Sequence, residues 1–415
     1  MRQIFNINNF LYIFFIFLYL NYCFFLYRII QRTNPFIVGD WFINYENGIV
    51  RRGLFGEIFF WFADKFNFQI LIILFILIAL FAFIFFFLTI KIIKQSKINL
   101  IYLLLILSPL TFLFNFYDPL TIGRKEILFF VFFTFYIYKI NNELSFSQKH
   151  HFLIFFLVGL FLALTHELVF FYMFFPLFIK FLILPKKKDI YHFCKSELFF
   201  IFGCLLGLLI IIYSSASLDP NTPKMICDKI ISYNINEIVC HGPINLAVLE
   251  FFEVISYTIN HAKNYNYYNY IFYYLIFVFS ILIIFSLVNI TSEKNKILYF
   301  FIFNVFQILM LCLLFVIVND WGRYLNIYFI FNSFILIKFF NFKLKETSLI
   351  GNSIIIVLII LNLSLWHMPH CCNKNFGNGF FSLKERIDIR IKSSNGYEDK
   401  TRELLLKVLN KFNIR

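Results

Sequence analysis

Long runs of apolar residues, separated by short polar segments, make up most of this chain. Hydropathy gives about eleven runs that suit membrane-crossing helices, which need roughly 20 mostly apolar residues each. The runs lie at about 9–30, 69–90, 98–116, 127–139, 151–165, 168–184, 198–215, 270–290, 298–318, 324–338 and 347–366. The pattern predicts an all-α, polytopic integral membrane bundle of about eleven transmembrane helices with outward-facing loops.

Composition points to the same class. Of the 415 residues, 61% are hydrophobic and 14% are charged, a balance that soluble domains of this length do not show. The net charge of +14 is divided between short loops and the C-terminal tail. We therefore expect the lipid bilayer as a partner and no nucleic acid, which would need a contiguous basic surface.

The basic residues of the loops alternate in kind. One set of five loops carries lysine and no arginine: Lys91, Lys94 and Lys97; Lys139 and Lys149; Lys180, Lys186, Lys187, Lys188 and Lys195; Lys294 and Lys296; Lys338, Lys343 and Lys345. The opposite set carries Arg32, Arg51, Arg52, Arg124 and Arg323. By the positive-inside rule the lysine loops face the cytoplasm. We predict a multi-pass protein of the bacterial cytoplasmic (inner) membrane, with a cytoplasmic N-terminus and an extracytoplasmic C-terminus.

This topology divides the chain into a large transmembrane bundle and a short C-terminal tail. Residues 1–366 form the transmembrane bundle, with outer loops at 31–68, 117–126, 216–269 and 319–323. Within the first loop, residues 54–63 are apolar except for Glu57 and too short to span, which predicts an interfacial or re-entrant helix. Residues 367–415 form a basic extracytoplasmic tail, where apolar residues at helical spacing predict one amphipathic helix: Leu405, Val408, Leu409 and Phe412.

The first outer loop has the densest group of charged residues. Asp40 and Glu46 precede the adjacent arginines Arg51 and Arg52, which stand before the predicted interfacial helix. Guanidinium groups near a helix N-terminus suit a phosphate or diphosphate, and a nearby carboxylate could act as a base. The alternative is a juxtamembrane loop whose arginines pair with Asp40, Glu46 or lipid phosphates.

Two further outer loops repeat this combination. The second loop contains Asp118, Arg124 and Lys125, and the third contains Asp320 and Arg323. Charges so close to hydrocarbon are costly unless they are paired or face a wet cavity. Local salt bridges, Asp118 with Arg124 and Asp320 with Arg323, would explain each loop alone. Three loops with Arg and Asp at one depth favour a shared anion-binding site.

A polar interruption in the apolar run 151–184 adds a fourth candidate. As one helix this run would be about 50 Å long, too long for one ordinary crossing. His166 and Glu167 lie near its middle, which predicts two short spans that meet there. Irregular backbone at this depth is tolerated beside protein or water, so His166 could act as a base. The alternative is a hydrogen-bonded polar pair that closes a tight turn.

Cysteines and histidines near the C-terminal side give only a weak metal signal. The order His367, His370, Cys371, Cys372 matches no strong zinc spacing, so we assign no metal site. Disulfides from this pair to Cys227 or Cys240 are favoured on the outer side. A Cys227–Cys240 bond alone would be worth roughly 3 kcal/mol.

Taken together, the chain resembles the GT-C-type membrane glycosyltransferases, in particular the O-antigen and capsule polysaccharide polymerases called Wzy. The resemblance rests on the whole topology, with an acidic first outer loop that precedes an interfacial helix. It implies that Asp40 and Glu46 stand where such enzymes carry a catalytic carboxylate, and that Arg51, Arg52, Arg124 and Arg323 bind a polyprenyl diphosphate. Other membrane proteins of polysaccharide assembly become candidate partners. No cofactor is required, although a divalent metal would be compatible.

The resemblance implies inverting glycosyl transfer, in which an undecaprenyl diphosphate leaves while an acceptor hydroxyl attacks. The arginines would neutralise the leaving group, and Asp40, Glu46 or His166, with Glu167 beside it, would take the proton. A monosaccharide transferase with a polyprenyl-phosphate donor is an alternative. A transporter or flippase would need a polar path open to both sides. A polysaccharide acyltransferase would need its histidine near the cytoplasm.

Overall fold

The computed structural model describes residues 7–371 with short gaps, and most of the described residues are helical. The gaps are residues 47, 67, 97–101, 141–150, 184–189, 216–218, 220, 247–250, 266, 287, 290–293, 341–342, 345–348 and 365–366. The predicted amphipathic helix of the tail lies outside the described residues.

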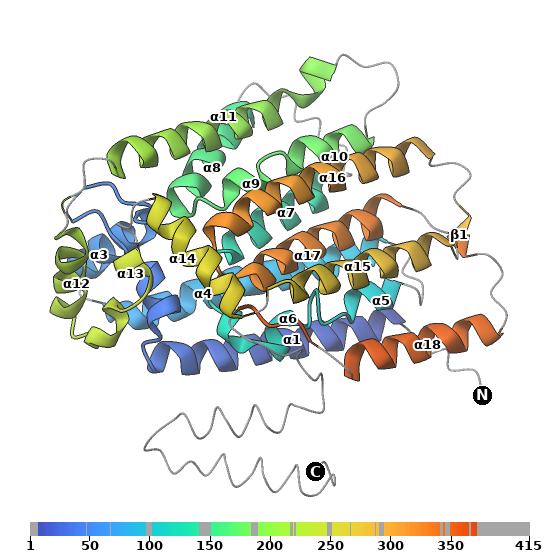
Figure 1. Ribbon diagram of the computed structural model, residues 1–415, viewed down its shortest axis with the longest axis horizontal. Coiled ribbons are helices and arrows are strands. Elements are labelled where there is room, and N and C mark those ends of the chain that lie inside the picture. The colour runs from blue at the N-terminus through green and yellow to red at the C-terminus, as the bar shows by residue number, and fades with distance from the viewer. Residues whose placement is uncertain are drawn as a thin grey trace, which may run out of the picture.

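The elements are labelled as in Figure 1. Among the described residues they are helices, apart from one sheet of two short strands, β1 and β2. They are α1 (Ile7–Gln31), η1 (Pro35–Gly39), α2 (Asp40–Phe42), α3 (Leu54–Phe66), α4 (Ile70–Gln95), α5 (Leu103–Ile106), α6 (Phe114–Tyr117), η3 (Pro119–Thr121), α7 (Ile127–Ile140), α8 (His151–Thr165), α9 (Val169–Tyr172), α10 (Phe175–Ile183), α11 (Ile190–Ser215), α12 (Thr222–Ser232), η4 (Glu237–Cys240), α13 (Pro243–Leu246), α14 (Phe251–Asn264), α15 (Asn269–Ser286), β1 (Val288–Asn289), α16 (Lys294–Ile317), α17 (Trp321–Phe339), β2 (Lys343–Leu344) and α18 (Leu349–Ser364).

Several helices are long and apolar enough to cross a membrane. Within the described residues there are five: Ile7–Gln31, Ile70–Gln95, Cys194–Ser214, Asn269–Ser286 and Asn295–Ile317. Shorter apolar helices lie at Ile127–Ile140, Phe152–Thr165 and Val169–Ile183. The predicted all-α class and multi-pass membrane character are therefore confirmed. The finer count of about eleven crossings stays a prediction.

The predicted span at 98–116 does not form a continuous helix over its described residues, 102–116. In place of a span at 98–116, the chain makes the short helices α5 and α6 with turns between them. Ser108 and Pro109 lie in this segment, and proline both lacks an N–H group and disfavours helix in the residue before it. The turn is buried, and Thr111 donates to the carbonyl of Leu105 within it. Irregular backbone is tolerated here because the surrounding helices enclose it.

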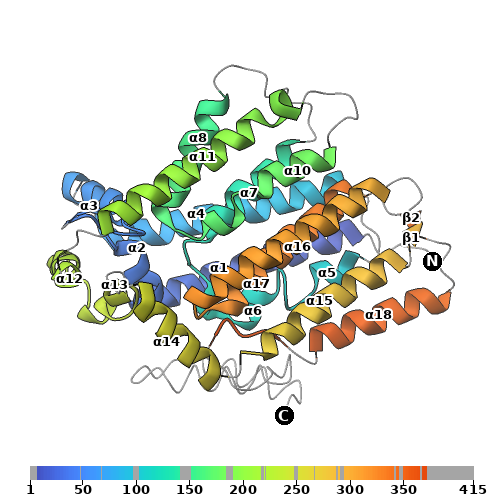
Figure 2. The same cartoon turned by 45° about the horizontal axis from the view of Figure 1, so that its top comes forward.

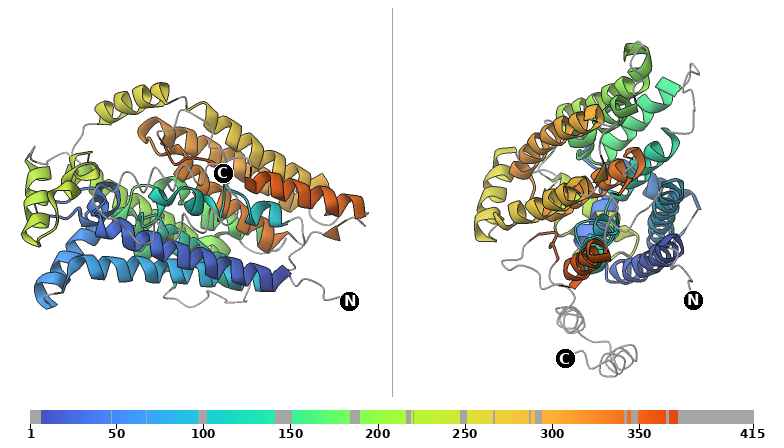
Figure 3. Two further views of the ribbon diagram at one scale, coloured as in Figure 1. Left: turned by 90° about the horizontal axis from the view of Figure 1, so that it is seen from below. Right: turned by 90° about the vertical axis from the view of Figure 1, so that its right-hand side faces the viewer.

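The loops divide between two ends of the bundle in the predicted way. At one end, near the N-terminus in Figure 1, β1 pairs antiparallel with β2, and Lys338 donates to the side chain of Gln95. These contacts join three of the lysine loops. At the opposite end lie α3, α12 and α13, and the views in Figure 3 show the same separation.

Helices α8 and α11 pack closely side by side, as Figure 2 shows. Glycines make this approach possible: a Cβ added at Gly203 would lie 2.2 Å from the carbonyl oxygen of Phe156, and one at Gly159 would lie 2.3 Å from that of Phe200. Gly203 and Gly207 have the four-residue spacing of small residues at membrane helix interfaces.

A small helical cap of α12, η4 and α13 covers the arginine-loop end. The Cys227–Cys240 disulfide ties α12 to η4. The cap contacts η1, where a Cβ on Gly39 would lie 2.4 Å from the carbonyl oxygen of Val239. Because these two cysteines pair with each other, the predicted disulfides from the tail cysteines to them are wrong. The contact holds η1 in place just before Asp40.

Candidate active site

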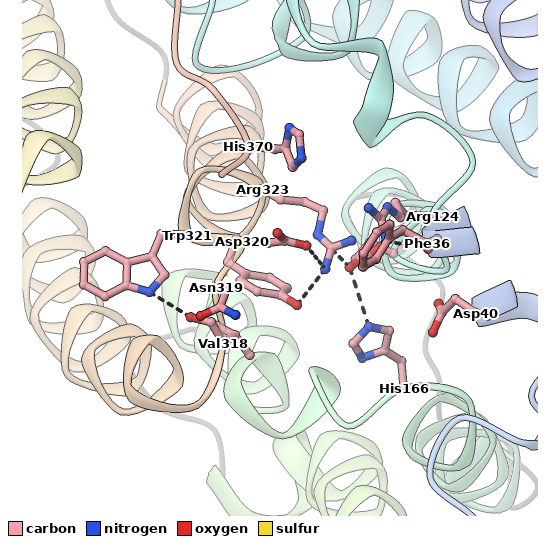
Figure 4. Close-up of polar contacts among 12 residues, drawn as sticks. Phe36, Asp40, Arg124, His166, Val318, Asn319, Asp320, Trp321, Arg323 and His370 are labelled. Carbon is pink, nitrogen blue, oxygen red and sulfur yellow. Dashed lines mark hydrogen bonds and ion pairs between the residues drawn. The ribbon is translucent and has the colours of Figure 1, made fainter. Parts of the chain in front are cut away.

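The four polar segments singled out in the sequence come together at one end of the bundle. Figure 4 shows Asp40, Arg124, His166 and Arg323 around a common centre, although they come from separate parts of the chain. Ion pairs and hydrogen bonds link side chains from all four segments. The prediction that these segments share one side and one depth agrees with this arrangement.

Arg52 connects the first outer loop to the break between α8 and α9. Its Nε lies 3.0 Å from both carboxylate oxygens of Glu167, and its Nη1 lies 3.2 Å from Oδ1 of Asp40. Burial favours a higher pKa for Asp40, but the nearby cations Lys125 and Arg52 lower it to about 2. The carboxylate of Asp40 is therefore charged and paired, which makes it a weak proton acceptor.

Lys125 is fully buried beneath this loop. Its Nζ donates to the carbonyl oxygen of Arg52 at 2.6 Å. Burial lowers the pKa of Lys125 to about 8, even though Asp40 counteracts it. The lysine keeps a charge at neutral pH and holds the backbone turn at Arg52, which has a φ of 66°.

The predicted interruption of residues 151–184 is present, since α8 ends at Thr165 and α9 begins at Val169. His166 is buried in this break, and burial together with Arg52 lowers its pKa to about 4. Its Nδ1 accepts a hydrogen bond from the Leu168 amide at 3.2 Å. The ring is thus neutral near pH 7 with its proton on Nε2, so His166 is poorly placed to act as the base.

Glu126 belongs to the second polar segment, Gly123-Arg124-Lys125-Glu126, but it was not among the predicted site residues. It is 3% exposed, and its Oε1 lies 3.2 Å from Nε of Arg323 and 3.6 Å from Nε2 of His166. In the described part of the chain, neither of its carboxylate oxygens accepts a hydrogen bond. Its place after Arg124 and Lys125 is visible in the sequence, but its burial and its contact with Arg323 depend on the fold.

Arg323 is held at the start of α17. Its Nη2 lies 3.0 Å from Oδ2 of Asp320 and donates to the hydroxyl of Tyr324 at 2.8 Å. The local Asp320–Arg323 bridge therefore forms, but Glu126 from another segment joins it. Burial favours a higher pKa for Asp320, and the arginines Arg323 and Arg124 lower it.

The salt bridge between Asp118 and Arg124, which was the alternative for the second loop, is not the contact that Asp118 makes here. Oδ2 of Asp118 lies 2.7 Å from Nδ1 of His370, which follows α18. Burial favours a lower pKa for His370, but Asp118 outweighs it and raises the pKa. Arg124 instead donates to the carbonyl of Phe36 in η1 at 2.5 Å. Within the described residues, Arg124 has no carboxylate partner at salt-bridge distance.

A small, partly open cavity lies beside these groups; the space of about 320 Å³ within its outline includes open solvent. Arg124, Glu126 and Arg323 line it together with the polar residues Asn115, Thr121 and Asn326 and the apolar or amphipathic side chains of Tyr22, Phe114, Ile127, Phe130 and Ile327. It therefore offers cations, one carboxylate and apolar walls to a ligand.

Two further predicted residues belong to the first outer loop. Glu46 is exposed, and its backbone amide donates to Asn44 at 3.0 Å. Arg51 is half-buried beside Arg52, where the Glu167 carboxylate acts on it electrostatically. The predicted interfacial helix is present as α3, which leaves Trp61 and Phe62 exposed.

A possible metal cluster of Asp320, His370 and Cys371 does not fit a metal ion well. Their potential ligand atoms lie within 4.8 Å of one another. However, the sulfur of Cys371 takes part in a disulfide, Asp320 is paired with Arg323, and His370 is paired with Asp118. A disulfide sulfur is not a thiolate ligand, so we assign no metal to these residues.

A second buried charged group lies elsewhere in the bundle, and the sequence reasoning had placed its lysine in a loop. Lys180 in α10 lies 3.7 Å from Oε1 of Glu197 in α11, and Tyr136 in α7 donates to the same oxygen at 2.7 Å. Tyr136 is ten residues after Glu126, which is about 15 Å along a helix.

No family model matches the chain, and no curated protein or solved structure shows significant similarity to it. The chemistry of the charged network and its cavity is therefore the basis for assigning a function.

Proposed function

We propose that this protein is an inverting membrane glycosyltransferase that uses polyprenyl-(di)phosphate-linked sugars at the outer face of the bacterial cytoplasmic membrane. Its most favoured role is the polymerisation of repeat units of a surface polysaccharide. The observation that carries this proposal is the convergence of four separate polar segments in one charged network, two of which line a cavity with Arg124, Glu126 and Arg323. Cations and a carboxylate beside apolar walls suit the phosphate group of a lipid-linked sugar and a nearby hydroxyl group.

The contacts favour Arg124 as the main ligand of the phosphate groups. Arg52 and Arg323 are each paired with two carboxylates, whereas Arg124 donates to a backbone carbonyl, and its buried Nε has no hydrogen bond among the described residues. A guanidinium with unused donors can bind an anion without first breaking an ion pair. Arg51, Arg52 and Arg323 would shape the positive surroundings in which negative charge develops.

The Cys227–Cys240 disulfide supports an extracytoplasmic position for this site. The bond lies in the cap that contacts η1, next to the network. Disulfides persist outside the cytoplasm and are rare inside it. Together with the lysine loops at the other end, the bond favours a cytoplasmic N-terminus.

Transport is the second candidate, and the packing between the two charged groups disfavours it. Phe133 of α7 is fully buried, with its ring 5.2 Å from that of Phe175 and 4.9 Å from that of Phe331. These aromatic rings lie along the α7 interval between Glu126 and Tyr136. A continuous polar path through this interval would require the ring cluster to open.

The test is deletion of the gene in its source organism, followed by a gel profile of the surface polysaccharide. Collapse of a ladder to a single repeat unit is expected for a polymerase. A persistent ladder that lacks one sugar would indicate the monosaccharide transferase. An unchanged profile would contradict both activities and favour transport.

Complementation with arginine variants then tests the site. Arg124→Ala is expected to abolish the polymer while the protein still inserts, and so are Arg51→Ala and Arg52→Ala. Arg32→Ala is the matched control, because Arg32 is an exposed arginine of the same outer region. A normal ladder from Arg124→Ala would remove this residue from the phosphate site.

A further inference from the structure

We propose that Glu126 is the catalytic base of this enzyme, and that the cavity beside it receives the acceptor hydroxyl. This inference rests on the proposed glycosyl transfer and assigns a role that Asp40, Glu46 and His166 were expected to fill. Its basis is the position of a buried carboxylate on a cavity wall without hydrogen bonds from the described residues.

A base must have a free lone pair that points to where the substrate proton lies. Asp40 gives its oxygen to Arg52 at 3.2 Å, and Glu167 accepts two bonds from Nε of the same arginine. Glu46 is exposed and outside the network. Of the carboxylates in the network, Glu126 alone both lines the cavity and, in the described region, leaves its two oxygens without hydrogen bonds.

The neighbours of Glu126 keep it in place without using up its oxygens. Nε of Arg323 is 3.2 Å from Oε1, but it too makes no hydrogen bond among the described residues, so the contact is electrostatic. Nε2 of His166 lies 3.6 Å from the same oxygen, which is longer than a normal hydrogen bond. Both contacts involve Oε1, so Oε2 is the oxygen without an ion-pair neighbour in the described part of the chain; it is buried, and a hydroxyl group would reach it from the cavity that Glu126 lines.

The proposed step balances as follows. The acceptor oxygen forms a bond to the anomeric carbon of the donor sugar, and the bond from that carbon to the phosphate oxygen breaks. The electron pair leaves with the polyprenyl (di)phosphate, whose charge Arg124 stabilises from the same cavity. The hydroxyl proton passes to Glu126 and is later released to water. Arg124 would thus stabilise the negative charge of the leaving group, and Glu126 on the same cavity would accept the proton of the acceptor.

The experiment compares Glu126→Gln, Glu126→Asp and the control Glu57→Gln in full-length protein. Glu57 is exposed in α3 and accepts a hydrogen bond from the Tyr45 amide, which glutamine can also accept. Membranes of the complemented deletion strain supply the endogenous lipid-linked repeat units. The rate of polymer formation is divided by the amount of folded, monodisperse protein, and a melting temperature is recorded for each variant.

We expect Glu126→Gln to lower this rate by about 10²–10⁴-fold, the usual contribution of a general base, with Glu57→Gln unchanged. Glu126→Asp keeps a carboxylate but withdraws it by one methylene, so an intermediate rate is expected. If Glu126→Gln does not fold, Glu126→Asp decides: a wild-type rate per folded molecule would overturn the proposal. So would a Glu126→Gln rate above a tenth of wild type.

The failure of this inference can be told apart from the failure of the proposed function. Active wild-type membranes with an active Glu126→Gln variant would overturn only the role of Glu126. A deletion strain with unchanged surface polysaccharide would overturn the glycosyltransferase assignment and the catalytic role together.

Discussion

The contact between Arg52 and Glu167 gives the sharpest test of how the outer segments are held together. Three Arg52–Glu167 distances lie between 2.5 and 3.0 Å, and the two side chains are only 18% and 21% exposed. Removing one partner of a buried, hydrogen-bonded ion pair costs about 3–5 kcal/mol. Because both side chains keep some contact with solvent, we expect the lower end, about 3 kcal/mol, for Glu167→Ala.

A double-mutant cycle isolates the interaction from the loss of each side chain. Arg52→Met, Glu167→Ala and the double variant would be unfolded in mixed detergent micelles by increasing dodecyl sulfate. The expected coupling free energy is about 2–3 kcal/mol. Lys229 and Asp64 provide the control cycle, since their charged atoms are 3.6 Å apart but 28% and 59% exposed, and such surface pairs contribute about 0–1 kcal/mol. An Arg52–Glu167 coupling no larger than the control would refute the proposed link between the segments.

Three further predictions concern the rest of the fold. Cys227→Ser, which removes the bond to Cys240 across a separation of 13 residues, should lower the free energy of unfolding by about 3 kcal/mol; a melting curve insensitive to this change and to reductant would contradict it. Asp118 raises the pKa of His370 above 6.5, so this pair should stabilise the protein fully below pH 6.5 and lose that effect as pH rises through the raised value. His370→Gln should flatten this part of a melting series against pH, and an unchanged slope would contradict the pairing. Gly203→Ala should lower the melting temperature, because the new methyl group would lie 2.2 Å from a carbonyl oxygen of α8; wild-type melting would show that α8 and α11 can separate without cost.

Much of the fold could be predicted because hydropathy and charge act locally along the chain. The length of the apolar run at 151–184 required an interruption, and the polar pair there marked its place, between α8 and α9. The described parts of three lysine loops likewise lie together at one end of the bundle, and the arginine segments lie at the other end. By contrast, hydropathy could not show that residues 102–117 fold into short helices and turns that are mostly buried, because that depends on the helices that enclose them.

The pairing of side chains was less predictable, because it depends on which helices become neighbours. The sequence suggested a local salt bridge between Asp118 and Arg124. In the structure, the segment that follows α18 brings His370 to Asp118 instead. From the sequence, Lys180 was interpreted as a loop lysine. In the structure it lies in α10, which packs against α11 and brings it close to Glu197. The disulfide between Cys227 and Cys240 was one of several pairings that the spacing allowed.

The distribution of charge within the network explains why one of its arginines can serve a ligand while the others hold the structure. A buried guanidinium with two carboxylates, as at Arg52, is already compensated, and an incoming phosphate would have to displace them. Arg124 is half-buried and donates to one backbone carbonyl, while its buried Nε makes no hydrogen bond among the described residues, so an anion would supply a missing interaction. Glu126 is in the opposite position, as a carboxylate with cationic neighbours but no described hydrogen-bond donor. Placing these two incompletely satisfied groups on one cavity costs stability, and a substrate that offers both an anion and a hydroxyl group would recover it.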